Sequence, residues 1–173
     1  MPTPLLSPTL TTKQYQKSQI SVSAKENITL LTLHSNRKLT HYGFYARILS
    51  IINDYTIPVE LLLTSDNCVS LAIDMDAVSA PALQDAQSEL RAYSRIGWSE
   101  DMVLLSVHIV SKDNSGEMLS SIFEILSACC IPVHSISYAA DEPTVYFVIR
   151  RSDVSRAQKT LYSNLHRHFD WWC

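Results

Sequence analysis

One order of sequence features occurs twice in this chain, and the repeat restricts the fold more than any other property. Gly43 begins an apolar helical pattern that ends before Ile57-Pro58-Val59. Gly116 likewise begins a helical pattern that ends before Ile131-Pro132-Val133. The copies are about 73 residues apart, which is too long for a solenoid repeat and fits a duplicated small α+β domain. We therefore expect two similar units in tandem.

Each copy has the predicted order strand, helix, strand, strand, helix. The helices are recognised by apolar residues at spacings of three and four, and the strands by short β-branched runs bounded by turn residues. In the first copy, strands are predicted over residues 28–33, 59–63, 68–73 and 96–98, with helices after Gly43 and from Pro81. In the second copy, strands are predicted over 103–110, 133–138 and 144–149, with helices after Gly116 and after Ser152-Asp153.

A β-α-β-β-α-β order forms a ferredoxin-like sandwich. The predicted fold class is therefore α+β, with two ferredoxin-like units whose antiparallel sheets carry helices on one face. Residues 1–24 contain three prolines among many Ser, Thr and Gln residues, so we expect a mobile N-terminal arm. The first unit is predicted over residues 25–100, and the second unit with a C-terminal tail over 101–173.

Charge and composition exclude several classes of function. The formal net charge of -3 provides no basic surface for nucleic acid, and no apolar run approaches the roughly 18–20 residues of a membrane span. The N-terminus lacks a basic segment followed by an apolar one, so no secretion signal is expected. None of the four cysteines forms a C-x-x-C pair, which fits buried thiols in a reducing compartment. We predict a cytoplasmic protein that binds neither nucleic acid nor membrane.

The sequence also provides no catalytic or metal-binding constellation. No spacing of Ser, Cys and His residues matches a nucleophilic triad or a zinc site. None of the three glycines lies in a glycine-rich loop that could bind a phosphate. The prediction is a protein with no catalytic residue, no metal and no cofactor.

Four separated segments resemble the regulatory region of lysine-sensitive aspartokinases. They are LTLHS (31–35), GFYAR (43–47), IPVEL (57–61) and LTSD (63–66), in the order and at the spacing of that family. The resemblance extends over about residues 25–169 and does not include a kinase half. It implies a tandem pair of ACT units in a non-catalytic regulatory protein of aspartate-family (lysine) amino-acid biosynthesis.

The resemblance also implies an effector site in the first unit, at an interface between two copies of the chain. A helix N-terminus offers free amides to a carboxylate, so the backbone of Gly43, Phe44 and Tyr45 is predicted to contact an amino acid. Glu60 stands where the family has an aspartate, and is predicted to hold an ammonium group. The whole predicted site comprises His41, Gly43, Phe44, Tyr45, Val59, Glu60, Thr64 and Ser65.

The predicted partners are a small amino acid (lysine or a relative), a second copy of the chain, and a separate kinase chain. The sequence departs from the family at Lys38, His41 and Pro58, where the family has methionine, serine and serine. Lys38 would repel a lysine side chain, and Pro58 removes a backbone donor. These departures leave open a structural dimerisation module with a degenerate pocket. A further alternative is the C-terminal fragment of an aspartate kinase.

Overall fold

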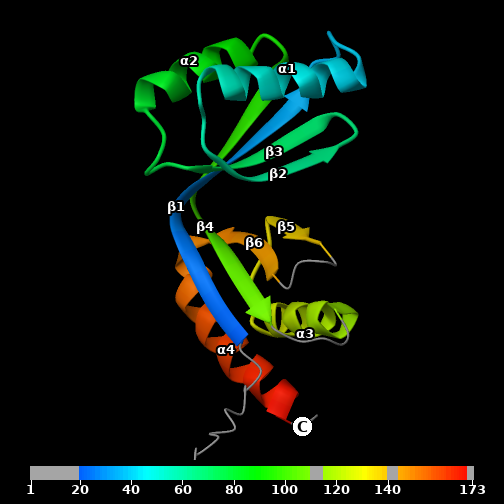
Figure 1. Ribbon diagram of the computed structural model, residues 1–173, viewed down its shortest axis with the longest axis vertical. Coiled ribbons are helices and arrows are strands. Elements are labelled where there is room, and N and C mark those ends of the chain that lie inside the picture. The colour runs from blue at the N-terminus through cyan, green and yellow to red at the C-terminus, as the bar shows by residue number, and fades with distance from the viewer. Residues whose placement is uncertain (1–19, 110–114, 140–143, 171–173) are drawn as a thin grey trace, which may run out of the picture.

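The computed structural model describes residues 20–109, 115–139 and 144–170 and contains one six-stranded antiparallel sheet of order β2-β3-β1-β4-β6-β5 (Figure 1). The strands are β1 (Ile20–Ser35), β2 (Val59–Ser65), β3 (Cys68–Asp74), β4 (Ser94–Ile109), β5 (Ser135–Tyr138) and β6 (Thr144–Arg150). The helices are α1 (His41–Asp54), α2 (Ala80–Leu90), α3 (Ser115–Ala128) and α4 (Val154–Asp170), with a short 3-10 helix η1 (Arg151–Asp153) before α4. The predicted α+β class and the repeated order of elements are confirmed. In the described ranges, no helix has the length and apolar character needed to cross a membrane.

The two units share the long strands β1 and β4, which the sequence did not indicate. The second half of β1 pairs with the first half of β4 in the first unit. The first half of β1, residues 20–25, pairs with the second half of β4, where Ile20 lies opposite Ile109. The strands predicted separately over 96–98 and 103–110 are therefore parts of one strand, β4.

This arrangement corrects the predicted unit boundaries. The arm predicted over residues 1–24 differs from the structure at residues 20–24, which form the beginning of β1. Ile20 is 6% exposed and packs in the core of the second unit, because its half of β1 forms the edge of that unit's sheet. The second unit therefore contains a strand that precedes the first unit in sequence. Residues 1–19 and residue 110 lie outside the described part of the chain.

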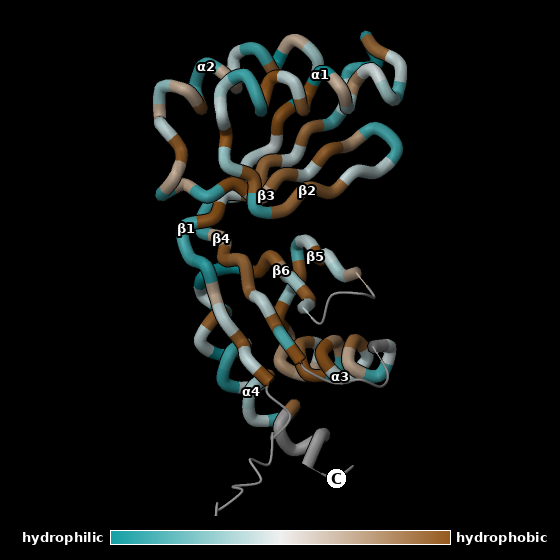
Figure 2. The backbone as a smooth tube through the Cα atoms, viewed as in Figure 1, coloured by the Kyte–Doolittle hydropathy of each residue, from teal (hydrophilic) through white to brown (hydrophobic). Residues whose placement is uncertain are grey.

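Each unit has its own core between its helices and one face of its half of the sheet. In the first unit, Phe44 and Ile48 of α1 pack with Leu71 of β3. In the second unit, Ile122 of α3 packs in a core with Phe147 of β6. Hydrophobic residues are concentrated along the strands and recur along each helix, as expected for helices that bury one face (Figure 2).

A third core lies on the helix-free faces, where the two halves of the sheet pack together. Leu61 and Ala72 of the first unit and Leu104 and Val148 of the second belong to it and are at most 9% exposed. Since no helix among the described residues covers these faces, the burial comes from the opposite half of the sheet. The helices α1 and α2 lie outside one half, and α3 and α4 lie outside the other (Figure 1).

Both strands that connect the units bend at the junction. The register between β1 and β4 shifts between Lys25 and Leu30. Asn27 of β1 and Asp101 of β4 adopt left-handed backbone angles, with φ of 58° and 55°. Asn and Asp tolerate these angles better than most residues because their short side chains form local hydrogen bonds. Each covalent connection between the units therefore passes through a bend.

Candidate effector site at the first helix and the edge strand

Helix α1 begins after Thr40, whose side chain caps it. Thr40 Oγ1 accepts a hydrogen bond from the Gly43 amide at 3.3 Å, and the Thr40 carbonyl accepts one from the Phe44 amide at 2.8 Å. Glycine suits this position because a Cβ on Gly43 would lie 2.9 Å from Thr40 Oγ1. Both amides already have partners within the chain, and the contact of this backbone with an amino acid stays a prediction. By helix geometry, the amides without an intrahelical partner are those of His41 and Tyr42.

Aromatic side chains surround this end of α1. The ring centroid of His41 lies 4.6 Å from that of Tyr45 and 5.3 Å from that of Tyr42, both in edge-on geometry. Tyr42 is 82% exposed, whereas Phe44 is 2% exposed and belongs to the core. Burial, followed by the negative charge of Asp66, raises the pKa of Tyr45, so its hydroxyl stays protonated at neutral pH. The predicted residues at this end of α1 thus have different roles. Phe44 anchors the helix in the core, whereas His41 and Tyr45 lie at the surface.

The end of β2 reaches the same end of the first unit. Thr64 and Ser65 are the last two residues of β2, and Asp66 and Asn67 form the turn to β3. β2 is two residues longer than the strand predicted over 59–63, because Thr64 and Ser65 also pair with β3. The Ser35 amide donates a hydrogen bond to the Asn67 carbonyl at 2.7 Å, which holds this turn beside the end of β1, from which the chain leads to α1. The structure therefore gathers His41, Gly43, Tyr45, Thr64 and Ser65 at one end of the unit.

Val59 and Glu60 lie at the opposite end of β2. Glu60 is five residues before Ser65, a separation of about 16 Å along an extended strand. Glu60 Oε1 forms an ion pair with Lys25 Nζ at 2.8 Å. Within one chain, Glu60 is therefore too distant to hold the ammonium group of an amino acid whose carboxylate binds at the beginning of α1.

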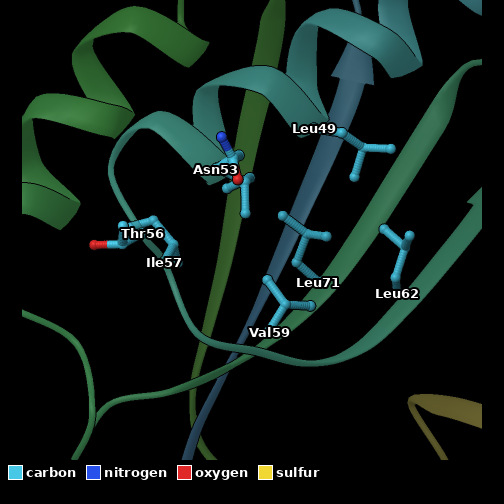
Figure 3. Close-up of a pocket in the computed structure, with 8 residues that line it drawn as sticks. Leu49, Asn53, Thr56, Ile57, Val59, Leu62 and Leu71 are labelled. Atoms are coloured by element: carbon cyan, nitrogen blue, oxygen red, sulfur yellow. The ribbon is translucent and has the colours of Figure 1, made fainter.

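An apolar groove that the sequence analysis did not identify lies between α1 and β2 (Figure 3). Its volume is about 560 Å³, and it borders β2, an edge strand of the sheet. Leu49 of α1 and Leu62 of β2 are each 42% exposed. The signal in the sequence was Leu49, an apolar residue outside the stripe of α1 that faces the core. The lining residues are Leu49, Ile52, Asn53, Thr56, Ile57, Val59, Leu62 and Leu71.

Two residues that depart from the aspartokinase pattern have structural roles near this site. Lys38 Nζ donates a hydrogen bond to the Ala92 carbonyl at 3.1 Å, which ties the loop before α1 to the end of α2. The expectation that Lys38 repels a bound lysine is not supported by this orientation. The Pro58 carbonyl accepts a hydrogen bond from the Asp74 amide at 3.3 Å.

Among the described residues, no group of three or more His, Cys, Asp or Glu side chains could hold a metal ion.

Comparisons by sequence and by structure both find aspartokinases or their regulatory domains. No family model matches the chain. The aspartokinase of Candida albicans is 27% identical over 152 residues, which are 88% of this chain and 28% of that protein. A C-terminal regulatory domain of aspartate kinase from Porphyromonas gingivalis has a TM-score of 0.71 and 26% identity, over 84% of this chain and 96% of that one. Escherichia coli aspartokinase III in complex with lysine and aspartate also has a TM-score of 0.71, at 26% identity, over 86% of this chain and 33% of that one.

The duplicated fold of the chain matches the fold of aspartokinase regulatory domains, and its sequence is similar to aspartokinases over the same residues. The similarity lies in the regulatory part of those proteins, as the match to the Porphyromonas gingivalis regulatory domain indicates. The chain spans less than a third of the length of the Candida albicans relative.

Proposed function

We propose that the chain is an amino-acid-sensing regulatory protein of aspartate-family (lysine) biosynthesis. The observation that best supports this function is the match over 96% of the Porphyromonas gingivalis regulatory domain. The proposed effector is lysine or a relative, because Escherichia coli aspartokinase III was solved in complex with lysine. The chain would act in the cytoplasm and transmit the binding signal to a separate kinase chain, through unequal affinity of the effector for two arrangements of the regulatory units.

Two copies of the chain would complete the effector site that one copy leaves divided. A two-fold axis at an edge strand such as β2 pairs the two strands antiparallel. An axis beside Leu62 places Glu60 of one copy opposite Thr64 of the other, because both positions are two residues from the axis. The effector ammonium would then bind Glu60 of one copy, and its carboxylate would bind the His41 and Tyr42 amides of the other.

The apolar groove beside β2 supports this mode of pairing. Leu49 and Leu62 are exposed in one copy, and a second copy at the β2 edge would cover both. Pairing would also satisfy the unpaired backbone groups of β2, which an edge strand otherwise leaves open to non-specific association. The same contact would thus stabilise the dimer and complete the binding site.

Isothermal titration calorimetry with lysine, threonine and methionine tests this function on a chain shown by light scattering to be dimeric. Binding of one of the three, saturating at one amino acid per chain, is the expected result. An absence of heat with all three, at millimolar amino acid and with a folded dimer, would refute amino-acid sensing by these ligands.

A structural dimerisation module is the second candidate function. Two observations favour it: Lys25 neutralises Glu60, and Thr40 occupies the amides of Gly43 and Phe44. Such a module would form the dimer in light scattering and give no heat in the titration. The third alternative, a fragment of an aspartate kinase, would share the fold and differ in the gene that encodes it.

A further inference from the structure

A charged cluster at the junction joins the two units. Lys25 Nζ lies 2.8 Å from Glu60 Oε1 and 2.7 Å from Asp74 Oδ2. Lys25 belongs to the first half of β1, where it lies opposite Leu104 in the sheet of the second unit. Glu60 and Asp74 belong to β2 and β3 of the first unit. The two ion pairs therefore bridge the units.

The alternation of side chains along the strands explains how Lys25 and Asp74 meet. Val22 and Ala24 pack against the core of the second unit, so Lys25 projects from the opposite, helix-free face of β1. Ile73 packs in the core of the first unit, so Asp74 also projects from a helix-free face. These faces are the ones that pack together in the third core, and the cluster lies where the two units meet.

Asp74 depends on Lys25 for compensation of its charge. Asp74 is 6% exposed, and Lys25 is its ion-pair partner among the described residues. The hydrogen bond from Lys25 is the main cause that holds the pKa of Asp74 below its ordinary value. The pKa of Lys25 is raised, mainly by its hydrogen bond to Asp74 and next by its hydrogen bond to Glu60. A buried carboxylate that loses its cation is destabilised more than an exposed one. The contact with Asp74 therefore matters more than the contact with Glu60.

The backbone beside the cluster is held at the bend of β1. The Asn27 carbonyl accepts a hydrogen bond from the Met75 amide at 3.0 Å, and the Asn27 side chain donates to the Asp76 carboxylate. Asp76 also donates its amide to Asp74 Oδ1 at 2.9 Å. The end of β3 and the bend of β1 are thus connected at the place where the Lys25 side chain crosses between the units.

We propose that Lys25, Glu60 and Asp74 form an electrostatic latch that sets the angle between the two units. Lys25 is the side chain that opens it, because its removal breaks both ion pairs and leaves the backbone bonds intact. Opening lets the helix-free faces separate about the bends at Asn27 and Asp101. An effector ammonium at Glu60 competes with Lys25 for the same carboxylate, and this consequence alone rests on the proposed function.

Hydrogen exchange of the full chain carrying Lys25→Met tests the latch, since methionine keeps much of the side-chain length and removes the charge. Peptides that contain Met75 and Asp76 should exchange roughly 2- to 5-fold faster, the factor expected for a partly exposed ion pair. Peptides from the interiors of α1 and α4 should be unchanged. The radius of gyration from small-angle X-ray scattering should increase at an unchanged oligomeric state.

Two matched variants distinguish the latch from a general effect of lost charge. Lys25→Arg retains the charge and should keep the exchange of the junction peptides near that of the wild type. Arg156→Met removes a cation whose pair with Asp153, at 2.6 Å, lies within the second unit, so the junction should be unaffected.

The latch is refuted by unchanged junction exchange in folded Lys25→Met, or by an equal increase in Arg156→Met. If Lys25→Met does not fold, Glu60→Gln provides the test, because it retains the pair between Lys25 and Asp74. The junction peptides of Glu60→Gln should then exchange faster by a smaller factor, and no increase would refute the latch. None of these measurements requires amino-acid binding. They would therefore still test the latch if the proposed function were refuted.

Discussion

Replacing Leu62 by lysine should dissociate the proposed dimer without unfolding the chain. Leu62 lies on the edge strand β2, lines the groove beside α1, and is 42% exposed. It belongs to none of the three cores, so the substitution leaves the interior of each unit intact. With a two-fold axis beside this position, the two introduced ammonium groups would face each other across the interface.

The expected loss follows from the exposed fraction of the Leu62 side chain. Complete burial of a leucine contributes about 1.5–3 kcal/mol, so covering the exposed 42% contributes about 0.6–1.3 kcal/mol per chain. A dimer contains this side chain twice, so the substitution should cost about 1.2–2.6 kcal/mol of association free energy. This corresponds to a roughly 7- to 70-fold higher dissociation constant. Repulsion between the two ammonium groups adds to the loss.

Sedimentation equilibrium over a range of protein concentrations measures the dissociation constant directly. Phe123→Lys is the matched control, because Phe123 is 43% exposed on α3 of the second unit, away from β2. The control should retain the wild-type dissociation constant. A wild-type chain that sediments as a monomer of 19.5 kDa at tens of micromolar would refute the reasoning, as would equal dissociation in both variants.

Four further outcomes are expected. Phe44→Ala should lower the free energy of unfolding in urea by about 3–5 kcal/mol, because Phe44 is 2% exposed, and a loss below about 1 kcal/mol would contradict its role as an anchor. Glu60→Gln should weaken amino-acid binding in calorimetry by about 1.5–3 kcal/mol. Lys25→Met should strengthen the same binding, because it frees the Glu60 carboxylate. Weaker binding to Lys25→Met would exclude competition between Lys25 and the effector for Glu60. The pKa of Asp74 is lowered from 3.8 by its contacts in the folded chain. The Asp74 carboxylate therefore stabilises the fold fully well above pH 3.8, and this contribution is lost as the pH falls through the lowered pKa. Acid unfolding curves of Asp74→Asn should lack this contribution. The isolated chain should form no aspartyl phosphate from ATP in a radiolabel assay, and product formed by pure protein would show that it is an enzyme.

The sequence by itself determined the elements of each unit, because their signals are local. The apolar spacing after Gly43 predicted α1, and the prolines at positions 58 and 132 predicted that each first helix ends before them. The repeat then determined the class of fold, because one order of elements occurs twice. Resemblance in four short segments indicated the aspartokinase regulatory region without reference to the tertiary structure.

The tertiary structure alone decided how the two units are joined and where the predicted site residues lie. Periodicity shows that a face is buried but does not show what covers it, so the pairing of residues 20–25 with the end of β4 could not be read from the chain. For the same reason, the ion pairs of Lys25 with Glu60 and Asp74 connect positions that are distant in sequence. The sequence identified Glu60 as an acidic residue on a strand. Its distance from the beginning of α1 and its charge partner depend on strand direction and on the bend at the junction, and these are properties of the assembled sheet.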